Sequence, residues 1–236
     1  MTSASRLLVY DVAQQAGPPL KFVTHSYRVQ ELARKQGWLP GARYINLRDV
    51  KRLGSLGFLD IDWQGYCFRR HIDAAKATRP FLTVARDIVD RDRLAQTLDE
   101  AEELLQYAQH VVIVPKDVRL ENDLEHKIPT TFILGFSVPT KYGGTAIPPQ
   151  AFKRPVHLLG GRPDVQRRFA RSLKVFSIDC NRFTLDAAFG DYFDGEIFRP
   201  HPIGGYERCL ADSLVNIDAL WANYRRPRLK GSGRAV

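Results

Sequence analysis

The chain of 236 residues lacks most features of secreted, zinc-binding and membrane proteins. Its three cysteines, Cys67, Cys180 and Cys209, are odd in number and widely spaced, which excludes a disulfide framework and a CxxC zinc knuckle. No run approaches the roughly 18 apolar residues of a membrane-spanning helix. The N-terminal MTSASRLLVYDVAQQ has no apolar core of signal-peptide length, because Asp11 and two glutamines interrupt it. We therefore expect an intracellular, cytoplasmic protein in a reducing compartment.

The chain has fewer acidic than basic residues. The chain has 35 Lys and Arg against 26 Asp and Glu, a net charge of +9. A basic excess of this size favours a polyanionic partner, nucleic acid above all, although charge that serves only solubility is the alternative. The 44% hydrophobic and 26% charged residues are ordinary for a globular domain and argue against long disordered regions.

Short apolar runs with little polar alternation recur along the chain, as in strands buried on both faces of a parallel sheet. The predicted strands are Lys21–Thr24, Arg43–Leu47, Phe58–Ile61, Phe81–Ala85, Val111–Val114, Thr131–Leu134, Val156–Leu159 and Val175–Ile178. Helical spacing of apolar residues predicts helices over Asp92–Gln109, Pro163–Leu173 and Gly205–Tyr224.

This alternation predicts an α/β fold, a minimal (β/α)8 TIM-like barrel, formed as one domain by residues 1–224. A doubly wound open sheet is the rival, and the lack of a GxGxxG after the first strand argues against it. Residues 225–236 carry five basic residues among Pro and Gly, which predicts a flexible basic tail.

Polar residues at the carboxyl ends of barrel strands are the catalytic candidates. Asp62, Asp87 and Asp179 each follow a predicted strand, with Asp60 as a neighbour of Asp62. Converging carboxylates can supply a nucleophile and an acid/base, whereas a single strand-end aspartate often only caps the next helix. We interpret Cys180 as a buried structural thiol, because no activating partner is evident in the sequence.

The run HLLGG (157–161) followed by FSIDCN (176–181) resembles the tRNA-guanine transglycosylase superfamily. DWQGY (62–66), FLTVARD (81–87), IVPK (113–116) and ILGF (133–136) occupy the positions of further family segments, in the same order. The resemblance implies that Asp179 is the nucleophile and Asp62 the general acid/base. It also implies a base-binding set comprising Asp87, Lys116, Gly135, Phe136, Gly160 and Gly161.

The chain also departs from the tRNA enzymes. Their zinc-binding cysteine motif is missing, and after Asp179 only His201 and Cys209 remain as soft metal ligands. The family's recognition glutamine is replaced by Pro115 or Lys116. A chain reduced in this way resembles the DNA-modifying branch of phages and bacterial modification clusters, which exchanges guanine in DNA for a 7-deazaguanine such as preQ0. The resemblance implies a bacterial, archaeal or phage-infected cell, no metal and no organic cofactor.

Base exchange requires two displacements at C1′ of the sugar, with a covalent glycosyl-aspartate between them. The expected partners are DNA and a free 7-deazaguanine base. We expect a basic rim around the acidic pocket to hold DNA phosphates, formed by Arg162, Arg167, Arg168, Arg171 and Arg182. Two alternatives stay open: an N-glycosidase or deoxyribosyltransferase acting on free nucleosides, and a non-catalytic nucleic-acid-binding barrel.

Overall fold

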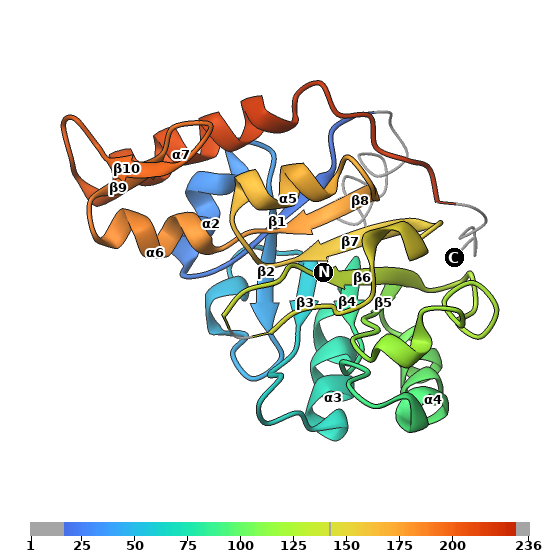
Figure 1. Cartoon of the computed structure of the whole chain (residues 1–236). Helices are drawn as coiled ribbons and strands as arrows, with labels where there is room; N and C mark the ends of the chain where they lie inside the picture. The colour runs from blue at the N-terminus through green and yellow to red at the C-terminus, as the bar shows by residue number, and fades with distance from the viewer. Residues whose placement is uncertain (1–16, 142, 230–236) are drawn as a thin grey trace.

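A computed structural model describes residues 17–141 and 143–229. Eight parallel strands pair in chain order, and β8 pairs with β1 to close the barrel (Figure 1). The predicted TIM-like barrel is therefore confirmed. The strands are β1 (Leu20–Thr24), β2 (Leu39–Arg43), β3 (Phe58–Asp60), β4 (Leu82–Val84), β5 (His110–Ile113), β6 (Ile133–Ser137), β7 (Pro155–Leu159) and β8 (Lys174–Asp179).

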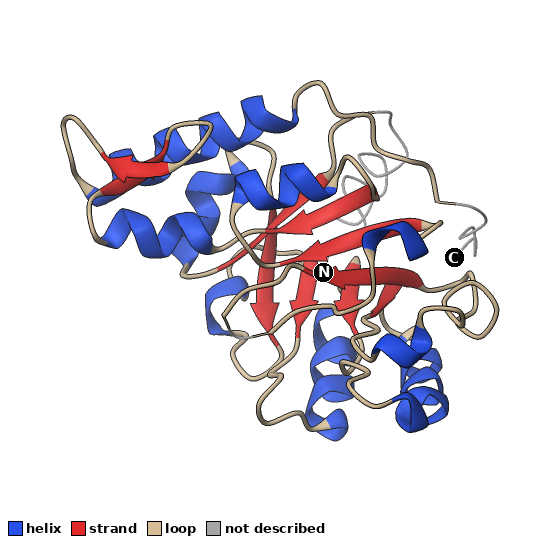
Figure 2. Ribbon diagram, in the orientation of Figure 1, coloured by secondary structure: helices blue, strands red, loops and turns tan. Residues whose placement is uncertain are grey.

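Helices cover the outside of the barrel, with α3 and α4 on one side and α2, α5, α6 and α7 on the other (Figures 1 and 2). Their bounds are α2 (Tyr27–Arg34), α3 (Phe68–Thr78), α4 (Leu94–Leu104), α5 (Pro163–Phe169), α6 (Arg182–Ala188) and α7 (Tyr206–Trp221). The connections after β2, β5 and β6 contain only 3₁₀ turns, at Arg48–Val50, Val118–Leu120 and Pro149–Ala151. An antiparallel pair, β9 (Asp191–Phe193) and β10 (Phe198–Pro200), lies between α6 and α7.

Two hydrophobic cores hold this arrangement together. One lies inside the barrel and is formed by Leu20, Phe22, Phe58, Phe81, Leu82, Val84, Val112, Val114, Ile133 and Phe176. The other lies between the outer face of the sheet and the helices, and includes Trp38, Leu104, Phe183 and Trp221. Because side chains alternate along a strand, residue parity decides which core a strand residue joins.

A bulge in β8 changes that parity. Val156 of β7 pairs with Val175, whereas the next residue, His157, pairs with Ser177, so Phe176 is an extra residue in β8. Phe176 packs in the interior core, and Ser177 lies close enough to His157 for a 2.8 Å hydrogen bond between its Oγ and the imidazole Nδ1.

The predicted strand Arg43–Leu47 is wrong, because β2 is Leu39–Arg43. Pro40 and Gly41 masked it, since both are unusual inside a strand. Gly41 is required there: a Cβ at this position would lie 2.3 Å from Oγ1 of Thr24 on β1. The predicted helices are confirmed in position, but each is shorter, because terminal residues form turns.

The segment after α7 returns to the amino-terminal end of the barrel. The amide of Arg226 donates to the carbonyl of Gly17 at 2.8 Å, and Leu229 packs against the interior core. Residues 230–236 of the predicted tail lie outside the described residues. Within the described part of the chain, no helix is both long and apolar enough to cross a membrane.

Candidate active site

Three aspartates from different strands meet at the carboxyl end of the barrel. Asp60 ends β3, Asp179 ends β8, and Asp87 follows β4. The negative charges of Asp179 and Asp87 both raise the pKa of Asp60, so the three carboxylates share one electrostatic environment. Strand-end carboxylates thus converge at the mouth, with Asp60 beside the expected Asp87 and Asp179.

Asp179 is held from several directions. Its Oδ1 accepts a 2.9 Å hydrogen bond from the amide of Gly160 and lies 3.5 Å from Nε2 of the buried His157. The amide nitrogen of Gln166 donates to the carbonyls of both Asp179 and Gly160, at 2.7 Å each. Oδ2 receives no hydrogen bond from the described residues, so one carboxylate oxygen is fixed while the other can react.

Asp60 is suited to proton transfer near neutral pH. Removal of water around the carboxyl, reinforced by the charges of Asp179 and Asp87, raises its pKa to about 7. The amide of Ile61, which donates to Oδ1 at 2.8 Å, and the positive charge of Arg43 oppose this rise. A group with a pKa near the working pH can both give and take a proton during catalysis.

Asp62, the predicted acid/base, lies two residues beyond the end of β3, in the loop to α3. Its Oδ2 is next to Gly65, where a Cβ would approach it to 3.1 Å. Asp60 lines the cavity described below, whereas Asp62, Asp87 and Asp179 do not. Asp60 is preferred to Asp62 because it ends β3 and interacts electrostatically with Asp179 and Asp87.

The predicted base-binding pair, Asp87 and Lys116, forms an ion pair. Lys116 Nζ lies 2.7 Å from Asp87 Oδ2, with the two side chains 23% and 17% exposed. The pair is accessible and follows adjacent strands, β4 and β5, at the same end as Asp179. It offers a donor and an acceptor side by side, as recognition of a purine edge requires.

The surroundings of Gly135 and Phe136 are closely packed, and the predicted contact of their backbone with a base stays a prediction. A Cβ on Gly135 would lie 2.7 Å from Val112 and Val114, so interior side chains occupy the space in front of it. Phe136 points outward and packs against Phe152 and Phe169, with ring centroids at 5.4 Å and 4.8 Å.

Gly160 and Gly161 form the turn that follows β7. Both have positive φ, +62° and +86°, which disfavours side chains. The amide and carbonyl of Gly160 hold Asp179 and Gln166. A Cβ on Gly161 would lie 2.5 Å from Val138. These glycines therefore contribute to the site by fixing the nucleophile candidate.

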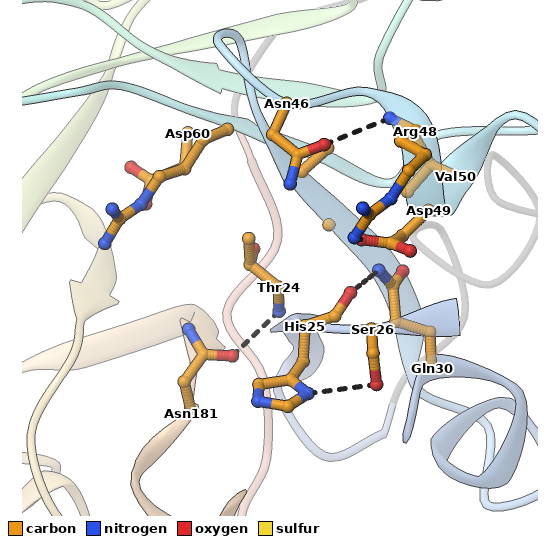
Figure 3. A pocket seen from close by; sticks show the side chains of 13 residues that line it. Thr24, His25, Ser26, Gln30, Asn46, Arg48, Asp49, Val50, Asp60 and Asn181 are labelled. Carbon is orange, nitrogen blue, oxygen red and sulfur yellow. Dashed lines mark hydrogen bonds and ion pairs between the residues drawn. The ribbon is translucent and has the colours of Figure 1, made fainter. Parts of the chain in front are cut away.

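A cavity of about 360 Å³ opens beside Asp60, between the carboxyl ends of β1, β2 and β3 (Figure 3). In the view of Figure 3, Asp60, Asn46 and Arg48 lie on one side and His25 and Asn181 on the other. Its polar lining also includes two buried atoms, Thr24 Oγ1 and Gln30 Oε1, that lack a hydrogen-bond partner among the described residues.

Sequence reasoning missed most of this lining, including Arg43 and Asn181. Arg43 ends β2, but the misplaced strand put it at a strand start, away from the mouth. Asn181 accepts the amide hydrogen of Thr24 at 2.8 Å and thereby ties β1 to the segment after β8. The sequence indicated Asn181 only by its position directly after the pair Asp179-Cys180.

The five predicted phosphate-binding arginines differ in their surroundings. Arg167 donates to the carbonyl of Leu220 at 3.1 Å and packs over Trp221, so it faces α7. Arg182 pairs with Asp186 through two hydrogen bonds, and Arg162 pairs with Asp164 at 3.0 Å. The exposed members of the set are Arg168, Arg171 and Arg182.

The remaining cysteines and His201 are engaged in the fold. Burial raises the pKa of the Cys180 thiol to about 12, and Cys209 lies in the outer core. His201 Nε2 lies 2.8 Å from Asp212, while Nδ1 accepts from the amides of Ile203 and Gly204. Over residues 17–141 and 143–229, no group of three or more His, Cys, Asp and Glu side chains is arranged to hold a metal ion.

Comparison with protein families identifies the family of the chain. Residues 33–222, most of the barrel and α7, match a family of unknown function, DUF6610. The chain belongs to this family. No curated protein matches the chain. The DUF6610 match thus spans β2 to β8, and with them Asp60, Asp87 and Asp179.

Proposed function

We propose that this DUF6610 protein is a DNA guanine transglycosylase that exchanges guanine for a 7-deazaguanine base through a glycosyl-Asp179 intermediate. The observation that carries the proposal is the pairing of an anchored carboxylate, Asp179, with a second carboxyl, Asp60, whose pKa is about 7. TIM barrels place catalytic groups at this end. The order of motifs, HLLGG before FSIDCN, adds support from the sequence.

In the first displacement, Asp179 Oδ2 attacks C1′ of the target nucleotide, and the bond from C1′ to the purine nitrogen breaks. The electron pair leaves with guanine, which takes the proton of the Asp60 carboxyl. Asp179 becomes an ester of the sugar, and Asp60 becomes a carboxylate. The Gly160 amide on Oδ1 orients Asp179 for this attack.

In the second displacement, Asp60 accepts the ring N–H proton of the incoming 7-deazaguanine. The nitrogen attacks C1′ from the face that guanine left, and the Asp179 carboxylate departs. Two inversions give retention at C1′. Charges and protons balance over the cycle, with no co-reactant beyond the two bases. Asp60 takes the role that the resemblance assigns to Asp62.

Asp87 and Lys116 are proposed to read the base. The carboxylate accepts hydrogen bonds from ring N–H and exocyclic amine groups, and the ammonium donates to a carbonyl or to the 7-substituent. Their 2.7 Å ion pair keeps both groups ordered before the base enters.

The test is mass spectrometry of nucleosides from duplex DNA incubated with the protein and isotope-labelled 7-deazaguanine. The proposal predicts labelled 7-deaza-2′-deoxyguanosine in the digested DNA, and loss of at least roughly 10³-fold in rate for Asp179→Asn. Asp73→Asn, an exposed carboxylate on α3, is the matched control and is expected to retain the rate.

Two results overturn the proposal. Release of free base without incorporation, or activity on mononucleosides that is insensitive to salt, identifies a nucleoside-directed glycosidase or deoxyribosyltransferase. Salt-sensitive DNA binding with no label and no Asp179 adduct on denaturing gels identifies a non-catalytic binding barrel.

A further inference from the structure

Large apolar side chains are exposed on four successive loops at the mouth. Ile45, Trp63, Val89 and Val118 are 39%, 57%, 67% and 54% exposed. They follow β2, β3, β4 and β5 in turn, and we call them the apolar rim. The other exposed large hydrophobic residues among those described all lie between Leu185 and Val215. The exposed large apolar side chains thus form two groups, and one of them lies on loops at the mouth.

The loop that carries Trp63 is braced from below. The hydroxyl of the buried Tyr44 donates to the carbonyl of Gly65 at 3.0 Å and accepts from the amide of Cys67 at 2.9 Å. Tyr44 itself stacks on His71, with ring centroids 5.4 Å apart. The indole is therefore presented to solvent on an ordered loop, which is the arrangement expected of a binding contact.

Charges of both signs lie at the mouth. Arg43 ends β2, and Arg48 and Arg86 lie on loops of the apolar rim, where they can meet a polyanionic backbone. Asp60 and Asp179 end β3 and β8, and Asp87 follows β4, where these carboxylates can accept from the N–H groups of a base. An extended acidic peptide would bring its carboxylates toward those of the pocket.

We propose that the apolar rim docks on double-stranded DNA and that Trp63 inserts into the base stack where the target nucleotide has been extruded. This inference rests on the proposed function and names its substrate form. C1′ chemistry at a barrel mouth requires the nucleotide to leave the helix, and an apolar wedge lowers the cost of the gap. The indole is the largest side chain of the rim.

The test is fluorescence anisotropy with the full chain and three fluorescein-labelled DNAs of one sequence. These are a single strand, a fully paired duplex, and a duplex with a guanine opposite an abasic site. Trp63→Ala is expected to weaken binding to the paired duplex by roughly 10- to 100-fold. The loss is expected to be only a few-fold on the single strand and intermediate on the abasic duplex, where extrusion costs less. Val215→Ala, which truncates a 50% exposed side chain on α7, is the matched control.

The inference is overturned if Trp63→Ala binds the paired duplex like the parent chain, or loses equally on duplex and single strand. If the variant shows the expected pattern but the parent chain incorporates no labelled base, the DNA interface stands and the exchange chemistry fails. If the parent chain exchanges bases and Trp63→Ala exchanges them equally well on duplex and single strand, the chemistry stands and the wedge fails.

Discussion

Two groups of strand ends form the barrel mouth, and they use their residues differently. On β3, β4, β5 and β8, charged side chains reach the mouth, among them Asp60, Lys116 and Asp179. On β6, the predicted contact Gly135 lies against interior side chains. After β7, the predicted contact Gly160 holds Asp179 through its amide. Position at the end of a strand therefore does not by itself identify a residue that contacts a ligand. Inward parity and available space decide whether a strand-end residue meets a ligand.

The strongest test of this contrast compares substitutions of Asp60, at the end of β3, and of Asp62, in the loop that follows. Asp60→Asn is expected to lower base exchange by roughly 10²- to 10⁴-fold, because the amide cannot transfer a proton. Asp62→Asn, the matched variant outside the cavity, is expected to retain most of the rate. Steady-state rates with labelled base measure both. A larger loss in Asp62→Asn would return the acid/base role to the loop.

The same carboxyl makes stability depend on pH. The folded pKa of Asp60 is about 7 against 3.8 for the free group, so the folded state holds the proton more tightly. Its contribution is fully present below about pH 4 and is lost as pH rises to about 7. The loss is at most about 4 kcal/mol.

Urea unfolding across this pH range measures the effect. Asp60→Asn is expected to gain stability relative to the parent chain as pH rises, with little difference at about pH 4. A parallel pH dependence of the two proteins would contradict the elevated pKa of this carboxyl.

On the β6 side, the expected effects concern folding. Gly135→Ala places a methyl group 2.7 Å from Val112 and Val114, and overpacking of this kind costs roughly 1–3 kcal/mol. Thermal unfolding measures the loss. Gly17→Ala is the matched comparison, because a Cβ there meets nothing within 4 Å and the φ of Gly17 is not positive. Unchanged stability of Gly135→Ala would show that the interior has room for a ligand there.

The smallest effect is expected from Lys116→Met, which keeps the apolar stem and removes the charge. Loss of one donor to the base is expected to raise KM for the incoming base by about 10-fold with little change in kcat. Lys127→Met is the control for net charge. Lys127 lies between β5 and β6 and pairs with Asp123. An equal effect of the two variants would assign Lys116 to general electrostatics.

The barrel itself was predictable because buried parallel strands leave short, nearly continuous apolar runs such as Val111–Val114. β2 was missed because its Pro40 and Gly41 meet a packing requirement of β1 that is invisible along the sequence. Because of that error, the position of Arg43 at the mouth was not predicted.

The site was predictable in part. Strand ends and motif order predicted that Asp87, Lys116 and Asp179 lie at one end of the barrel, where the structure has them. The sequence favours Asp62 over Asp60 because the end of β3 at Asp60 is not evident from it, although Phe58 and Asp60 share one face of β3. The surroundings of Arg167 could not be foreseen, since they depend on the packing of α5 on α7.

The hydrogen bond from Arg226 to Gly17 brings the two ends of the described chain together beneath the barrel, opposite the mouth. The ring of strands is closed by pairing between β8 and β1 and needs no covalent link at that seam. A circular permutant that joins these ends and opens a loop on the same lower face would preserve every residue at the mouth. Connectivity of the chain and geometry of the site are, in this barrel, separable.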